Sequence, residues 1–198
     1  MKTVGILALM VAFAAPMVAQ TPRPLNELTE ELKKLEFLMG DWSAEGSVYP
    51  AEGEKETWSG TARGRWVLRG RHLRLDTTVT TKAGTTESSA MLTWDPHRER
   101  YHALLFSSTE PTPRFVAGTF DGKKLSLQGP RGDAETKLSM VFEKSSDDEY
   151  TLNVDMVREE STVHMADGKY MRKRHGGLSL RRDVPYTGFE EERYESIR

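Results

Sequence analysis

Hydrophobic and polar positions divide the chain into one helical segment and a long β region. From Pro24 to Met39, leucines recur at intervals of three and four residues, with glutamates and lysines between them. This is the period of an amphipathic helix. Beyond Gly46 the period changes to two, and short alternating runs separated by turn residues continue almost to Arg182. One helix followed only by strands predicts a sheet that curls closed, with the helix across one end.

A first hairpin is predicted around the turn Arg69-Gly70. One face of the strand before it carries apolar and small residues: Trp58, Gly60, Ala62, Gly64 and Trp66. A two-residue turn places Trp66 opposite Leu73 and Gly64 opposite Leu75, so apolar side chains meet across the pair. The same register places Arg65 opposite Arg74 on the other face.

Further hairpins follow in sequence order. The expected facing sets are Trp94, Leu92 and Ala90 with Tyr101, Ala103 and Leu105; Val116 and Gly118 with Leu127 and Leu125; Leu138, Met140 and Phe142 with Val154, Leu152 and Tyr150. Val163 and Met165 are expected to turn back through Asp167-Gly168 toward Tyr170, and Leu178 and Leu180 to form a last strand.

Counted from Asp41–Tyr49, these segments give nine or ten strands. The prediction is a mainly β fold, a single antiparallel up-and-down β-barrel with an N-terminal helix. A closed barrel of that size can hold one small ligand in its interior.

The first residues predict export. Lys2 precedes an uncharged, mostly apolar run from Val4 to Ala15, and alanines follow, the pattern of a secretory signal peptide. Cleavage is expected after Ala19, which gives a signal peptide over 1–19, a linker over 20–24, a barrel domain over 25–182 and a polar tail over 183–198. The destination is then the periplasm or the medium.

Composition limits the classes of partner that the protein is expected to have. The chain has no cysteine, which excludes disulfides and the thiol of a bacterial lipid anchor, so neither a disulfide framework nor membrane anchoring is expected. The formal net charge is −2. A nucleic-acid-binding domain would carry a clear basic excess, so nucleic acid is not an expected partner. The oligomeric state stays open.

A small-molecule ligand is the expected partner. The candidate lining residues are the apolar side chains expected to point inward: Trp58, Trp66, Leu92, Trp94, Tyr101 and Leu105. Arg65, Arg71 and Arg74 form an arginine-rich hairpin that could meet an acidic headgroup at the rim. The alternative is that these arginines lie on a solvated outer face, neutralised by water or by Asp76.

No motif in the sequence specifies a reaction, a catalytic residue or a metal ligand. An enzyme that uses the cavity as its active site remains an alternative, with His72 or His102 as general base, and it requires a carboxylate or hydroxyl within hydrogen-bond reach of the imidazole. A third possibility is an envelope interaction protein that has no ligand.

The block Leu-Met-Gly-Asp-Trp-Ser-Ala-Glu-Gly from Leu38, the hairpin Trp66 to Leu73 and the Trp94-Asp-Pro turn resemble a bacterial family known as domain of unknown function 1579. This resemblance implies a lipocalin-like or calycin-like barrel and no established activity. The same opening, with Tyr49-Pro50, is similar to that of nitrobindins. That similarity implies haem as a cofactor, held by His164 or His175.

Overall fold

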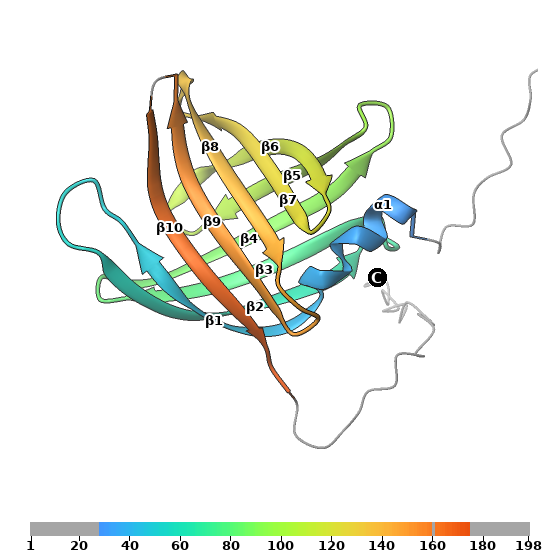
Figure 1. The fold of residues 1–198 in the computed structure, drawn as a ribbon, viewed down its shortest axis with the longest axis horizontal. Coiled ribbons are helices and arrows are strands. Elements are labelled where there is room, and N and C mark those ends of the chain that lie inside the picture. Colours follow the sequence, from blue (N-terminus) through green and yellow to red (C-terminus); the bar gives the residue numbers. More distant parts are fainter. Residues whose placement is uncertain (1–27, 160, 175–198) are drawn as a thin grey trace, which may run out of the picture.

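The computed structural model describes residues 28–159 and 161–174. Within them, ten strands form one closed antiparallel ring, preceded by a short helical segment (Figure 1). The helical part is α1 (Glu30–Lys33) followed by the 3₁₀ turn η1 (Lys34–Leu38). The strands are β1 (Gly40–Val48), β2 (Glu56–Val67), β3 (His72–Thr81), β4 (Gly84–Asp95), β5 (Arg100–Ser107), β6 (Glu110–Asp121), β7 (Lys124–Arg131), β8 (Asp133–Lys144), β9 (Glu149–Arg158) and β10 (Ser161–Arg172). Each strand pairs with the next, and β1 pairs with β10, which confirms the predicted up-and-down barrel.

The predicted register of the first hairpin is confirmed. Trp66 lies opposite Leu73, and Arg65 lies opposite Arg74. Arg69 and Gly70 both have positive φ, of 59° and 77°, and the amide of Arg71 donates to the carbonyl of Leu68 at 3.3 Å. Positive φ at both central residues is the geometry of a two-residue turn that matches the strand twist. The pairing of Trp94 with Tyr101 is also confirmed.

Two other predicted registers are wrong by two residues. Gly118 faces Leu127, because Gly122, with φ of 56°, is the first and not the second central residue of the β6–β7 turn. Phe142 faces Leu152, because Lys144 continues the β8 ladder opposite Tyr150. A shift of two residues leaves every side chain on its predicted face, whereas a shift of one would have reversed it.

The turn predicted at Asp167-Gly168 is also wrong, since both residues lie inside the continuous strand β10. Gly168 lies opposite Gly46 of β1, which lies opposite Trp58 of β2. A Cβ at Gly168 would lie 2.7 Å from the ring of Trp58. Glycine is therefore required there because an indole ring covers the strand, and not because the chain reverses. Leu178 and Leu180, the predicted last strand, lie outside the described residues.

The helical segment closes one end of the barrel (Figure 1), called the covered end below. It begins later than predicted: Thr29 is the N-cap, and its hydroxyl accepts a hydrogen bond from the amide of Leu32 at 3.3 Å. Residues 24–27 of the predicted helix lie outside the described residues. Leu35 and Leu38 are fully buried. Gly64 allows η1 to sit close to the wall, because a Cβ there would collide with the carbonyl oxygen of Leu38.

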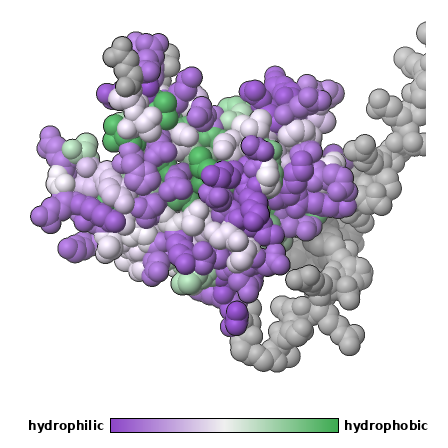
Figure 2. All heavy atoms as spheres, in the orientation of Figure 1, coloured by the Kyte–Doolittle hydropathy of each residue, from purple (hydrophilic) through white to green (hydrophobic). Residues whose placement is uncertain are grey.

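Outward-facing positions are mostly polar. The face shown in Figure 2 is predominantly hydrophilic, with its apolar residues in a few small groups. Among the described residues, no helix has the length and apolar character needed to cross a membrane.

Candidate ligand-binding site

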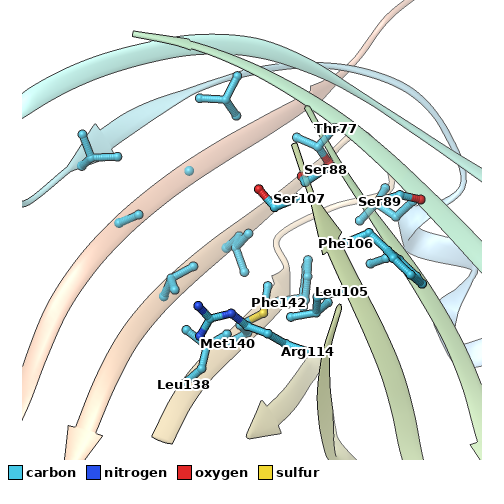
Figure 3. A pocket seen from close by; sticks show the side chains of 18 of the residues that line it. Thr77, Ser88, Ser89, Leu105, Phe106, Ser107, Arg114, Leu138, Met140 and Phe142 are labelled. Atoms are coloured by element: carbon cyan, nitrogen blue, oxygen red, sulfur yellow. The ribbon is translucent and has the colours of Figure 1, made fainter. Parts of the chain in front are cut away.

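The half of the barrel away from α1, called the open end below, contains a cavity of about 310 Å³. Most of its walls are apolar side chains that point inward from β2 to β5 and from β8 to β10: Trp58, Leu75, Val79, Ala90, Leu105, Leu138, Met140, Phe142, Leu152, Val154, Ala166 and Tyr170. Figure 3 shows the side chains of Leu105, Leu138, Met140 and Phe142 gathered around this space. An apolar interior with a few polar groups is the usual composition of a small-molecule site.

An aromatic layer separates the cavity from the covered end. Tyr170, which lines the cavity, stacks on Tyr150 with ring centroids 4.4 Å apart and planes at 7°. Tyr150 in turn meets Trp42 edge to face at 4.8 Å and Phe37 of η1 at 5.9 Å. Burial raises the pKa of both tyrosines, so both phenols are neutral at physiological pH. The layer is thus an uncharged aromatic floor.

Hydroxyl groups lie on one side of the cavity. Ser88 of β4 and Ser107 of β5 face each other, and Thr77 of β3 pairs with Ser88. All three line the cavity (Figure 3). They provide donors and acceptors for a polar group of a ligand without placing a charge in the wall.

One ion pair stands at the open end of the cavity. Arg114 and Glu110 of β6 both line it and form two parallel hydrogen bonds, Nε to Oε2 and Nη2 to Oε1, each 2.5 Å long. The hydrogen bond from Arg114 lowers the pKa of Glu110, and the positive charges of Arg114 and Arg131 lower it further. Glu110 is therefore ionised, and the pair presents a fixed guanidinium to the interior.

The wall is irregular beside this pair. Leu105 faces Arg114, and Ser107 faces Glu110. Between these two pairs, β6 has three residues, Pro111–Pro113, opposite the single residue Phe106 of β5, so the ladder contains a bulge. Proline has no amide hydrogen, and two prolines in this interval remove donors from the ladder. Phe106 lines the cavity and is also exposed to solvent. The cavity therefore reaches the surface at this interruption of the wall.

The predicted lining residues divide between the two halves of the barrel. Trp58 and Leu105 line the cavity. Trp66, Leu92, Trp94 and Tyr101 pack in the core but do not line the cavity. The hydroxyl of Tyr101 donates to Glu31 of α1, where both the backbone carbonyl, at 2.8 Å, and Oε2, at 2.9 Å, are within reach. The alternation of inward and outward side chains correctly predicts that all six residues lie in the interior of the barrel. It does not predict which half of the barrel is filled by side chains.

The predicted arginines lie on the outer wall or in a turn and do not line the cavity. Arg65 and Arg74 both reach Asp76, at 3.2 Å and 2.7 Å. Partial burial opposes ionisation of Asp76, but hydrogen bonds from Arg74 and Ser89 lower its pKa. Arg71 is exposed beside the β2–β3 turn. The alternative of a face neutralised by Asp76 matches this arrangement.

None of the histidines in the described part of the chain lines the cavity. His72 pairs with Val67, and His102 pairs with Thr93. All four side chains lie at positions of their strands that face outward. Neither histidine can therefore act as a general base on a molecule held inside the barrel. His164 pairs with Asp155, and its Nδ1 lies 2.7 Å from that carboxylate on the outer face. It is not placed to bind a haem iron in the interior, and His175 lies outside the described residues.

Arg114, Ser88 and Ser107 were not among the predicted lining residues, although the alternation of their strands carries a signal for them. Arg114 has the parity of Val116 and Gly118, which were assigned to the inside. Ser88 and Ser107 are the next inward pair beyond Ala90 and Leu105. Extending each inward face to the end of its strand would have identified an arginine and two hydroxyls inside the barrel.

Comparisons with known proteins agree with the fold. The family model described as "Protein of unknown function (DUF1579)" matches residues 27–172. No curated protein sequence matches this chain significantly. The crystal structure of Rv2717c from M. tuberculosis is similar with a TM-score of 0.57 and 14% identity, over 75% of this chain and 100% of that one. The S-type phycobiliprotein lyase CPES from Guillardia theta gives a TM-score of 0.50 and 11% identity, over 75% and 99%. At these identities the likeness shows a shared barrel fold. The similarity to nitrobindins stays a prediction.

Proposed function

The chain belongs to the DUF1579 family of proteins of unknown function, and from its geometry we propose that it binds a small apolar or amphiphilic molecule inside the barrel. The observation that carries the proposal is the cavity of about 310 Å³ above the aromatic floor. Its volume is at the lower end of the range of about 300–1,000 Å³ typical of small-molecule sites. The ligand is therefore small, comparable to a medium-length acyl chain or a compact ring system.

The composition of the walls supports this ligand class. Burial of an apolar chain against Leu138, Met140 and Leu152 gains about 25 cal/mol per Å² of apolar surface removed from water. The hydroxyls of Ser88 and Ser107 and the guanidinium of Arg114 give the site a polar side, which favours a molecule with one polar end. A neighbour of the same fold is named a phycobiliprotein lyase, which is compatible with this role.

The experiment has two arms. Native mass spectrometry after gentle purification is expected to show a fraction of the protein with additional mass from a bound molecule. Isothermal titration calorimetry with 1-decanol, a neutral amphiphile, is expected to show saturable binding at one site. Absence of both additional mass and titratable binding, for 1-decanol and for its acid analogue decanoate, overturns the proposal.

Export is part of the proposal, because Lys2 and the run from Val4 to Ala15 have the order of a secretory signal peptide. The expected mature protein begins at Gln20. Expression of the full chain in bacteria, followed by fractionation and N-terminal sequencing, tests this directly. An intact N-terminus at Met1 in the cytosolic fraction would contradict export.

A ligand-free interaction protein is supported by a different observation. On the outer wall Leu104 of β5 pairs with Phe115 of β6, and the two residues are 42% and 48% exposed. Neighbouring exposed apolar residues are a common feature of protein interfaces. If this surface is the functional one, Phe115→Ser will abolish self-association or partner binding in sedimentation experiments while 1-decanol fails to bind the wild type.

A further inference from the structure

Arg114 is an unusual residue for the inside of a barrel. It pairs with Leu105 on β5, has the same parity as the buried Val116, and lines the apolar cavity. Its side chain is only 26% exposed. A cation placed against apolar walls loses hydration, and that cost is offset only by a well-placed anion. Arg114 is therefore positioned where a carboxylate is needed.

In the structure Glu110 supplies that carboxylate. It lies four residues before Arg114, and its two oxygens accept from Nε and Nη2 in the parallel arrangement typical of arginine with a planar carboxylate. The side chain of Glu110 is 38% exposed, more than that of Arg114. Glu110 can therefore move into water at a smaller cost than Arg114 can.

A second cation makes the exchange of Glu110 possible. The positive charge of Arg131, at the end of β7, contributes to the low pKa of Glu110, so the two groups are within electrostatic reach. When Glu110 leaves Arg114, it retains a favourable interaction with Arg131 and with solvent. Arg131 does not line the cavity, so after the exchange Arg114 alone faces the carboxylate of the ligand.

We propose that the ligand of this cavity carries a carboxylate that replaces Glu110 on Arg114, with its apolar part extending toward Leu138 and Met140. This inference rests on the proposed function and names the chemical class of the ligand. Arg114 keeps its charge-assisted hydrogen bonds in the exchange, while the released Glu110 gains hydration and keeps the attraction of Arg131, so the headgroup adds affinity to that of the apolar tail. A neutral headgroup cannot replace the carboxylate, because it would leave the guanidinium without a counter-charge.

The test compares two ligands that differ only in the headgroup, decanoate and 1-decanol, by isothermal titration calorimetry at pH 7. The wild type is expected to bind decanoate at least tenfold more tightly than 1-decanol. Arg114→Gln is expected to lose at least tenfold in affinity for decanoate and to retain its affinity for 1-decanol. Glu110→Gln is expected to gain affinity for decanoate severalfold, because it removes the competing carboxylate.

The matched control is Arg63→Gln. Arg63 forms an ion pair with Asp41 at 2.6 Å on the outer wall, away from the cavity, and its removal should leave both affinities unchanged. Circular dichroism and urea unfolding confirm that each variant is folded, and Glu110→Gln gives an independent result if Arg114→Gln is not.

The outcomes separate the two proposals. Equal binding of decanoate and 1-decanol by the wild type, or unchanged decanoate affinity in Arg114→Gln, overturns the headgroup assignment and leaves the proposed function standing. Failure of both compounds to bind overturns the headgroup assignment, and if native mass spectrometry also shows no additional mass, it overturns the proposed function as well. A loss of decanoate affinity in Arg63→Gln equal to that in Arg114→Gln also overturns the assignment, because it would reflect the overall charge of the protein.

Discussion

The covered end and the open end of this barrel follow the same alternation of inward and outward side chains, but one is filled and the other is hollow. At the covered end, the aromatic rings of Trp42, Tyr101 and Tyr150 pack against α1 and η1. At the open end the inward positions of β3 to β5 carry smaller groups, such as Thr77, Ser88 and Ala90. Side-chain volume, and not backbone topology, therefore decides where the barrel has room for a ligand.

Two tryptophans give the largest expected contrast between the ends. Trp42 and Trp58 both point inward and both donate from Nε1 to a backbone carbonyl, at 3.2 Å and 3.0 Å. Trp42→Ala is expected to lower the free energy of unfolding by about 4–5 kcal/mol, and Trp58→Ala by about 2–3 kcal/mol. The difference arises because Trp58 borders a cavity and has fewer packing partners to lose. Urea unfolding measures both values.

The control for this comparison is ligand binding. Trp58→Ala should change the affinity for an apolar ligand, whereas Trp42→Ala, measured under conditions where it remains folded, should not. Equal losses of stability for the two variants would show that the open end is as well packed as the covered end.

Filling the cavity is the next largest perturbation. Met140→Trp places a larger side chain in the hollow half and is expected to reduce ligand affinity at least tenfold, while the free energy of unfolding changes by less than about 1.5 kcal/mol. The matched variant Leu92→Trp introduces the same ring in the filled half, where Leu92 is 1% exposed, and should cost about 1–3 kcal/mol. Calorimetry and urea unfolding report the two quantities. Retained affinity in Met140→Trp would place the ligand elsewhere.

A single hydroxyl gives a smaller effect. Tyr101→Phe removes the hydrogen bond that links β5 to Glu31 of α1 and should destabilise the protein by about 1–2 kcal/mol. Tyr49→Phe, which removes a 2.7 Å bond to Asp167 at the open end, should cost less, because that bond is more accessible to water. Thermal unfolding of the two variants tests the order. The reverse order would mean that the helical segment contributes little to stability.

The smallest effect concerns pH. The pKa of Glu110 is lowered in the folded protein, first by the hydrogen bond from Arg114, so the pair stabilises the fold above the usual glutamate pKa of 4.5 and loses that contribution as the pH falls through the lowered value. Because the pair is partly exposed, the contribution should be less than about 1 kcal/mol. In Glu110→Gln the stability difference from wild type should shrink between pH 6 and pH 3. A constant difference across this range would contradict the assignment.

Much of the barrel could be predicted because alternation with period two is a strong signal wherever one face is buried. The hairpin around Arg69-Gly70 is the clearest case, since apolar residues meet in only one register. The β6–β7 and β8–β9 registers failed because two turn positions are compatible with the same facing parity. Gly122 marks a turn, but the residues around it do not tell whether it is the first or the second central residue of that turn.

The site was harder to predict than the fold. Parity identifies Trp94 and Leu105 equally as inward, and only the position of the helical segment along the barrel axis separates the filled half from the cavity. Gly168 was misread because a glycine needed for a reversal and one needed beneath an indole ring look the same in sequence. Arg114 was not predicted because a single arginine at the end of an inward face is a weaker sequence signal than the dense arginine cluster on the outer wall.

The interval Pro111–Pro113 has a consequence for solubility. An interrupted ladder leaves backbone groups unpaired, and such groups are where a foreign strand could attach and start β-aggregation. Attachment of a strand requires amide donors, and the two prolines have none. The protein can therefore tolerate an interrupted ladder in its wall, because the prolines disfavour the pairing with other chains that an unprotected sheet edge would allow.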